Sequence, residues 1–446
     1  MNQGTIIMVA LALGSLGLAW SSRPTEAAAV SFADTGEALS PGFTDPSLAT
    51  ALEVTTWDDK VATVVRFAVE QKKGRWVIPS HNDYPADGTE RMGKAASSFI
   101  DVKKDIYYGD NAGEHGQFGV LDPAGDDGKG DEKGKHVLIK DASGAVLVDV
   151  IVGKAVPEKQ GYFYVRAPSE KRVYGARLEL DISTNFSDWI EKDLLKVKRE
   201  ELVTMLYDPY AVDEQSKRVM NSSPIRADLE KVDGKDEWVP ATGVEVPEGK
   251  ILDSAKVRQI VTAIASIKIV GVRPRPEQLT FKELQTKGFF VSGTADQQRL
   301  FGNEGEARVV TKDGLVFSLY FGEITHESGL ALTAGTEAPP AEPTPEGEAE
   351  AEKQANRYMF VDVAYDPSLD KGSDGVSDVE EPAEPEADDA PKLKGAERAQ
   401  MLQARFGAWF YVISDASFKQ IHKERGDLFK VPPVPKDGAK PPGGAP

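Results

Sequence analysis

Two stretches of this chain share one order of turn, tryptophan strand, proline and polar loop, and this repeat constrains the fold more than any other feature. Residues 73–87 read KGRWVIPSHNDYPAD, which predicts a turn, a short apolar strand and a polar loop before a helix. Residues 234–249 read GKDEWVPATGVEVPEG and repeat that order. The recurrence predicts two copies of one structural module.

The first copy is predicted to combine an antiparallel sheet with a helix. Residues 52–58 and 61–71 are rich in β-branched and aromatic residues, which favour strands. A helix should begin near Asp87 or Thr89, whose side-chain oxygens suit an N-cap. Its predicted buried face has the spacing 0, 3, 4, 7 and 10, and consists of Met92, Ala95, Ala96, Phe99 and Val102.

The rest of the first copy is predicted to be strands and a closing helix. The strands are expected at residues 137–140, 145–152, 162–166 and 173–180. Helical spacing relates four apolar residues further on, with Ser183 or Thr184 as the expected cap: Phe186, Trp189, Ile190 and Leu194.

The second copy repeats these elements and is longer. Residues 202–208 parallel residues 52–58, and Asp313-Gly314 predicts a hairpin like that of residues 137–153. Residues 410–412 (FYV) echo residues 163–165, which have the same sequence. The predicted second helix starts near Asp253 and repeats the apolar spacing of the first with Val257, Ile260, Val261, Ile264 and Ile267.

These patterns predict an α+β fold of two duplicated modules, each an antiparallel sheet with a packed helix, preceded by an N-terminal transmembrane segment. Acidic, proline-containing tracts predict disordered inserts near 328–356 and 367–393. The alternative is that an α+β chain repeats its periodicities without duplication. The expected parts are an anchor or signal segment at 1–23, a linker at 24–49, a first module at 50–199, a second module at 200–431 and a disordered tail at 432–446.

The N-terminal segment predicts where the protein is located. Residues 4–20 read GTIIMVALALGSLGLAW and carry no charge. A bilayer span needs about 20 apolar residues, with a lower limit of about 17, whereas a signal-peptide core has roughly 7 to 15. We expect an uncleaved anchor; the alternatives are a signal peptide cleaved at the A-x-A sequence of residues 27–29 and a buried helix. Anchor and signal peptide both place the bulk of the chain outside the cytoplasm, facing the periplasm.

Composition excludes several classes of function. The 72 acidic and 53 basic residues give a net charge of -19, and no segregated basic patch is present, so a nucleic-acid partner is not expected. The chain has no cysteine, which excludes disulfides, thiolate metal sites and a cysteine nucleophile.

No catalytic, cofactor-binding or metal-binding residue is predicted. The chain lacks a G-x-S-x-G sequence, and residues 125–135 fail the spacing of a phosphate-binding loop, with His136 where Ser or Thr is needed. The five histidines show no metal-ligand spacing and are expected to be surface or half-buried polar residues: His81, His115, His136, His326 and His422.

Asp83 and Asp87 are the best carboxylates for acid–base chemistry. They flank Tyr84-Pro85, and paired carboxylates can work as acid and base when their surroundings separate their pKa values. The simpler interpretation makes Asp87 a helix cap. The second copy has Val244 and Glu248 at the comparable positions, so the pair is not repeated.

A partial calcium-loop pattern lies in the second acidic tract. Gly372 occupies position 3, where Asp or Asn belongs, and Pro367 and Pro382 exclude the flanking helices. An acidic linker explains the spacing more simply. The residues that match positions 1, 5, 6, 9 and 12 are Asp370, Asp374, Gly375, Asp378 and Glu381.

Several motifs also resemble a known family. They are GRWVIPSHNDYPAD at 74–87, KKDI at 103–106, GVLDP at 119–123, GYFYVR at 161–166, DWI at 188–190 and ARFGAWFYVIS at 404–414. The chain resembles the family catalogued as domain of unknown function 4340, in the form found in planctomycete-type bacteria. The resemblance implies an N-terminal membrane segment, an exported α+β region, no established activity and, in some relatives, an association with ABC transporter systems of the gliding-motility type. It supplies no catalytic residues.

Together these features predict a membrane-tethered, extracytoplasmic binding or scaffold protein, an accessory of an ABC-type transport or cell-envelope complex. The expected partners are the membrane, through the N-terminal segment, and a membrane protein complex. No cofactor is expected. The alternative is a carboxylate-dependent envelope hydrolase that uses Asp83 and Asp87.

Overall fold

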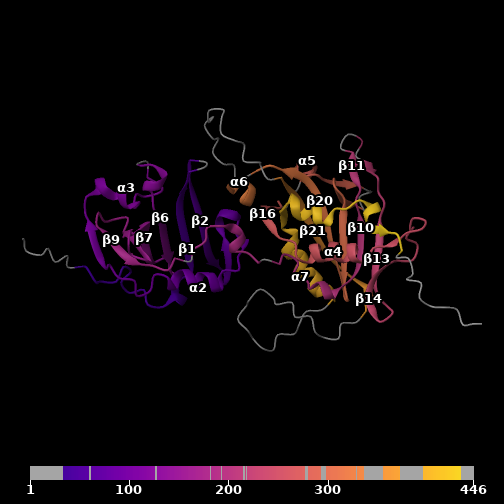
Figure 1. Ribbon diagram of the computed structural model, residues 1–446, viewed down its shortest axis with the longest axis horizontal. Coiled ribbons are helices and arrows are strands. Elements are labelled where there is room, and N and C mark those ends of the chain that lie inside the picture. The colour runs from indigo at the N-terminus through magenta and orange to yellow at the C-terminus, as the bar shows by residue number, and fades with distance from the viewer. Residues whose placement is uncertain are drawn as a thin grey trace, which may run out of the picture. The chain divides into compact units, whose positions relative to one another are not determined.

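The computed structural model divides the chain into two compact units, residues 1–66 with 92–182 and residues 67–91 with 183–446 (Figure 1). The predicted anchor at 1–23, residues 336–354 and 372–394 of the inserts, and residues 433–446 of the tail lie outside the described residues. The structure describes residues 34–59, 62–125, 128–180, 182–191, 193–213, 216, 218–276, 280–292, 298–327, 329–335, 355–371 and 395–432.

The first unit contains an antiparallel sheet in which the strands follow the order β1-β6-β7-β8-β9-β5. Alternating residues of these strands are buried, for example Val137 and Ile139, as expected for a sheet with one face on a core. The strands are β1 (Ala51–Asp58), β5 (Ile106–Gly109), β6 (Lys135–Lys140), β7 (Val146–Ala155), β8 (Tyr162–Arg166) and β9 (Val173–Arg177). The helices are α2 (Thr89–Ser97), which begins in residues of the second unit, and α3 (His115–Phe118).

The second unit contains an antiparallel sheet with the order β14-β13-β10-β19-β20-β21-β22-β16. Its strands are β10 (Leu202–Asp208), β13 (Ile225–Val232), β14 (Lys235–Pro240), β16 (Ile269–Pro274), β19 (Glu306–Thr311), β20 (Asp313–Thr325), β21 (Asn356–Asp370) and β22 (Trp409–Ser414).

Smaller strand pairs complete the second unit. They are β11 (Ala211–Asp213) with β12 (Arg218–Met220), β15 (Ile251–Leu252) with β23 (Phe429–Lys430), and β17 (Phe289–Ser292) with β18 (Arg299–Gly302). The strand β2 (Thr63–Lys72) begins in the first unit and ends in the second, where it pairs with β3 (Arg75–Ile78), which pairs with β4 (Tyr84–Pro85).

Helices pack on one face of the second sheet (Figure 1). They are α4 (Ser254–Ala265), α7 (Gly395–Gly407) and α8 (Asp415–Ile421). The ring of Phe406 in α7 contacts Phe317 of β20, and Phe418 in α8 lies 5.2 Å from Phe321 of the same strand. Because side chains alternate along a strand, the cross-strand row Arg308, Ser318 and Asp362 lies on the opposite face.

Helices of the second unit contact both edge strands of this sheet, and such contacts protect edge strands from pairing with other chains. At β14, the Trp238 N–H donates to Ser254 Oγ at 2.9 Å, and Arg258 donates to the Asp236 carbonyl at 2.9 Å. At β16, the helix α6 (Gly329–Ala334) lies so close that a Cβ on Gly271 would stand 2.1 Å from the Leu332 carbonyl oxygen. Only glycine fits that position.

The repeated stretches form similar hairpins. Lys73-Gly74, between β2 and β3, has φ values of 51° and 79°, and Asp233-Gly234, between β13 and β14, has 49° and 76°. Two consecutive positive φ values are typical of type I′ turns, which match the twist of the flanking strands. The α+β class and the antiparallel sheets expected from the sequence are therefore confirmed.

The prediction of a helix that closes the first copy after residue 184 is wrong, although the four apolar residues assigned to it are buried. Only the 3-10 turn Phe186–Asp188 forms. Ser183 Oγ donates to Asp188 at 2.6 Å and accepts from the Asn185 N–H at 3.1 Å, while the Trp189 indole donates to the Ser183 carbonyl at 2.8 Å. These local hydrogen bonds offer the backbone an alternative to a helix.

Part of the predicted linker belongs to the first unit. The Gly36 N–H donates to the Lys104 carbonyl at 2.9 Å, and Leu39 donates to Val102 at 2.7 Å. Phe43 is 3% exposed. Residues 34–49 are therefore packed, and the expectation of a free linker is wrong for them.

The predicted inserts also contain ordered elements. The helix α6 lies within 328–356, and β21 continues through residues 367–370.

Within the part of the chain that the structure describes, no helix has the length and apolar character of a membrane span.

Candidate functional site

His81, in the repeated stretch 73–87, is buried in the second unit. Its ring stacks on Phe186 at 4.3 Å between centroids, and Nδ1 shares a 2.9 Å hydrogen bond with Ser80 Oγ. Nε2 is buried without a hydrogen-bond partner among the described residues. Burial, aided by the charge of Arg273, lowers the pKa of His81 to about 4, so the ring is neutral at neutral pH.

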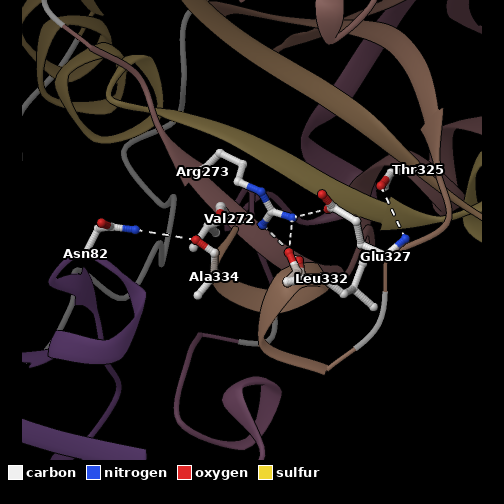
Figure 2. A network of polar contacts seen from close by, with 8 residues as sticks. Asn82, Val272, Arg273, Thr325, Glu327, Leu332 and Ala334 are labelled. Carbon is white, nitrogen blue, oxygen red and sulfur yellow. Dashed lines mark hydrogen bonds and ion pairs between the residues drawn. The ribbon is translucent and has the colours of Figure 1, made fainter. Parts of the chain in front are cut away.

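Asn82 and Tyr84 also contact residues of the second unit. Asn82 has a φ of 57°, and its amide donates to the Ala334 carbonyl of α6 at 3.5 Å (Figure 2). The ring of Tyr84 meets the edge of Trp409 at 4.9 Å. Burial raises the pKa of Tyr84 to about 12, so its hydroxyl stays protonated. The stretch thus contributes packing and hydrogen bonds.

Arg273 holds α6 against β16. Figure 2 shows its guanidinium among the carbonyl groups of α6 and the carboxylate of Glu327. It donates to the Leu332 carbonyl at 2.8 Å, to Ala331, and to Glu327 at 2.6 Å. Arg273 is 7% exposed, so its guanidinium is shielded from solvent, whereas the Glu327 side chain is 40% exposed.

Two more basic side chains lie over the aromatic rings beside Arg273. We call Arg273, Arg275 and Lys287 the basic cluster. Arg273 Cζ and Lys287 Nζ each lie 6.0 Å from the Tyr358 ring centroid. Lys287 Nζ is also 5.5 Å from the Phe410 ring, and Arg275 Cζ is 5.5 Å from the Phe360 ring. These positions suit cation–π attraction.

A buried carboxylate elsewhere in the second unit is fully compensated. Glu306 is 1% exposed and pairs with Arg299 at 2.6 Å and Arg308 at 3.0 Å. The Tyr210 hydroxyl donates to it at 3.3 Å, and burial strongly raises the pKa of Tyr210. The buried negative charge of Glu306 is thus neutralised by two cations and one hydroxyl group, which is a structural role.

The structure does not bring Asp83 and Asp87 together as a buried pair. The Asp83 carboxylate accepts from Lys72 Nζ at 2.8 Å, and its side chain is 51% exposed. The Asp87 N–H donates to the Trp189 carbonyl at 2.7 Å. Because α2 begins at Thr89, Asp87 precedes the cap position, and its predicted capping role is wrong.

The other histidines are dispersed. His115 bonds the Lys171 carbonyl at 2.8 Å, and His136 pairs with Asp149 at 2.7 Å. His422 stacks on Phe418 at 4.7 Å, and burial lowers its pKa; His326 is exposed. In the described ranges, no three His, Asp or Glu side chains are grouped to hold a metal ion.

The calcium-loop pattern falls almost wholly on residues that are not described. Asp370 ends β21 and accepts from the Tyr365 hydroxyl at 2.9 Å. Asp374, Gly375, Asp378 and Glu381 lie outside the described residues.

The basic cluster was not predicted from the sequence. Its signal is present in IVGVRPRP at 269–276, where two arginines alternate at the end of an apolar strand. Lys287 gives no such signal, because its neighbours Tyr358 and Phe410 are far away in the chain.

Comparison with known proteins gives one match. The family model described as a domain of unknown function, DUF4340, matches residues 76–288. The matched segment includes His81, Trp238 and the basic cluster, and it ends before β21. No curated protein and no solved structure matches the chain.

Proposed function

We propose that this chain, which belongs to the DUF4340 family through residues 76–288, is a membrane-tethered extracytoplasmic binding or scaffold protein. In this proposal it is an accessory of an ABC-type transport or cell-envelope complex. The uncharged apolar residues 4–20 support the tether and the export of the chain.

The main support for the proposal is that side chains of residues 73–87 pack and form hydrogen bonds inside the second unit. His81 and Tyr84 are buried, and Asn82 hydrogen-bonds α6. Asp83 lies in an exposed ion pair with Lys72. Acid–base catalysis by carboxylates depends on surroundings that separate their pKa values, which an exposed, paired Asp83 does not have. The stretch therefore supports a binding or scaffold role over the hydrolase.

We further propose that the two modules predicted at 50–199 and 200–431 arose by duplication. The order β1-β6-β7-β8-β9-β5 in the first unit parallels β10-β19-β20-β21-β22-β16 in the second. Along the chain, the hairpin β2-β3 follows β1, and β13-β14 follows β10. This alignment equates β21 with β8 and β22 with β9, so the two FYV sequences at 163–165 and 410–412 are not equivalent.

Membrane fractionation tests the tether. The full chain, expressed in a Gram-negative host, should stay in carbonate-washed membranes and be digested by protease added to spheroplasts. A variant that lacks residues 1–23 should be soluble and protected inside the cell. Release of the full chain by carbonate, or its protection in spheroplasts, would refute the proposed tether or the proposed orientation.

A further inference from the structure

The ammonium group of Lys287 has no hydrogen-bond or ion-pair partner among the residues that the structure describes. It lies over the rings of Tyr358 and Phe410, and its side chain is half-buried. Ring faces attract a cation but leave the three ammonium N–H donors without acceptors. Burial is the largest effect on Lys287 and lowers its pKa; Glu283 raises that pKa, Arg273 lowers it and Glu327 raises it, in decreasing order.

The neighbouring basic groups leave the same site positively charged. Arg273 is compensated by Glu327 at 2.6 Å. Arg275 is exposed and donates to the Gly407 carbonyl at 3.1 Å, without a carboxylate partner in the described part of the chain. Glu283 is engaged by Thr280 in the capping box of α5 (Phe281–Thr286), at 2.8 Å from Oγ1.

The charges of the basic cluster indicate that the site favours an anionic ligand. Among the described residues, Lys287 and Arg275 have no carboxylate within ion-pair distance, although Glu283 and Glu327 attract Lys287 at longer range. Grouping like charges and partly desolvating them costs free energy, which an anion bound between them offsets. Arg275 lies over the ring of Phe360 and Lys287 over that of Phe410, and the centroids of these two rings are 5.7 Å apart.

We propose that Lys287 and Arg275 bind a phosphate group, with Phe360 and Phe410 as an apolar floor and Arg273 as a fixed positive charge behind it. A phosphate monoester carries a charge of about -1.5 to -2 and can pair with both cations, which lack an ion-pair partner among the described residues. The planar guanidinium of Arg275 suits two phosphate oxygens, and Lys287 supplies a point charge. This deepens the proposed binding function, on which it rests for its use in the cell.

Titration of the purified full chain in detergent micelles tests the site. The probes are inorganic phosphate, at constant ionic strength, and micelles that contain phosphatidic acid or phosphatidylcholine. Binding of inorganic phosphate identifies a soluble phosphate compound as the source. Binding of phosphatidic acid micelles alone identifies a lipid headgroup. Either result supports the site if it depends on Lys287 and Arg275.

Variants test whether phosphate binding depends on Lys287 and Arg275. Lys287→Met and Arg275→Gln should each weaken binding at least about tenfold, equivalent to about 1.4 kcal/mol, while Lys287→Arg should retain it. Lys282→Met, on the exposed side of α5, is the matched control and should stay within about twofold of wild type. Unchanged unfolding midpoints show that the variants are folded.

The proposal is overturned if neither probe binds, or if Lys287→Met and Lys282→Met bind equally. Phosphate binding can be measured without any membrane partner. If the chain binds phosphate through Lys287 but recovers no permease or ATPase subunit from solubilised membranes, the accessory role is refuted and the phosphate site stands.

Discussion

Arg273→Met should release α6 from β16. The variant removes the donor to the Leu332 and Ala331 carbonyls and to Glu327. Breaking a buried ion pair costs about 3–5 kcal/mol, and a hydrogen bond to a charged group contributes about 1.5–3 kcal/mol. Because Glu327 is 40% exposed, its carboxylate can be rehydrated, so the lower end applies. We expect a loss of about 3 kcal/mol in the free energy of unfolding.

Two measurements check this prediction. Urea unfolding followed by tryptophan fluorescence gives the stability, and hydrogen exchange with mass spectrometry reports on residues 329–335. Exchange in α6 should become faster in Arg273→Met than in wild type. Arg226→Met is the control, because Arg226 is exposed on β13 and lies 3.4 Å from Asp228. It should change stability by less than about 0.5 kcal/mol.

If both arginine variants lose the same small amount of stability and α6 exchanges at the wild-type rate, Arg273 does not hold α6 against β16. That result would mean that the carbonyl and carboxylate partners of Arg273 contribute nothing to holding α6.

Further predictions concern three glycines, a histidine and an aspartate. Gly271→Ala should lower stability by about 1–3 kcal/mol in urea unfolding, because its Cβ would meet the Leu332 carbonyl, whereas Gly426→Ala has open space and should change little. Gly93→Ala, inside α2 and with no atom near the added Cβ, should raise the melting temperature, because alanine favours a helix by about 1 kcal/mol. His81 takes up a proton near its ordinary pKa of 6.5 in the unfolded chain, but only near 4 in the folded chain. The contribution of its neutral ring to the free energy of unfolding is therefore complete above pH 6.5 and is lost as pH falls towards 4. Between pH 7 and 4.5, wild type should therefore lose about 2–3 kcal/mol more than His81→Phe in urea titrations; equal losses would contradict the buried, neutral ring. Asp83→Asn should leave the unfolding midpoint unchanged within error, because an exposed ion pair contributes little.

Local patterns predicted the elements whose own residues decide their structure. The apolar spacing of Val257, Ile260, Val261 and Ile264 matches the buried face of α4. Asp313-Gly314 predicted the hairpin between β19 and β20, in which Gly314 has a φ of 76°. Such periodicity and turn chemistry act over a few residues, so they are visible in the sequence.

Contacts between distant residues were not predictable in the same way. The carbonyl of Leu332 lies 59 residues from Arg273, and Asn82 reaches Ala334 across 252 residues. The apolar spacing that begins at Phe186 gave the correct burial but the wrong helix, because the hydrogen bonds of Ser183 compete locally. Long-range pairing depends on the order of strands in the sheets, which one sequence does not encode in a local pattern.

Affinity purification of the full chain from detergent-solubilised membranes tests directly whether the protein is a tethered accessory of a membrane complex. Mass spectrometry should identify the proteins that accompany it and the first residue of the chain itself. We expect a permease or ATPase subunit among them, with the chain beginning at Met1 or Asn2. A soluble chain that begins near Val30 and purifies alone would contradict this expectation.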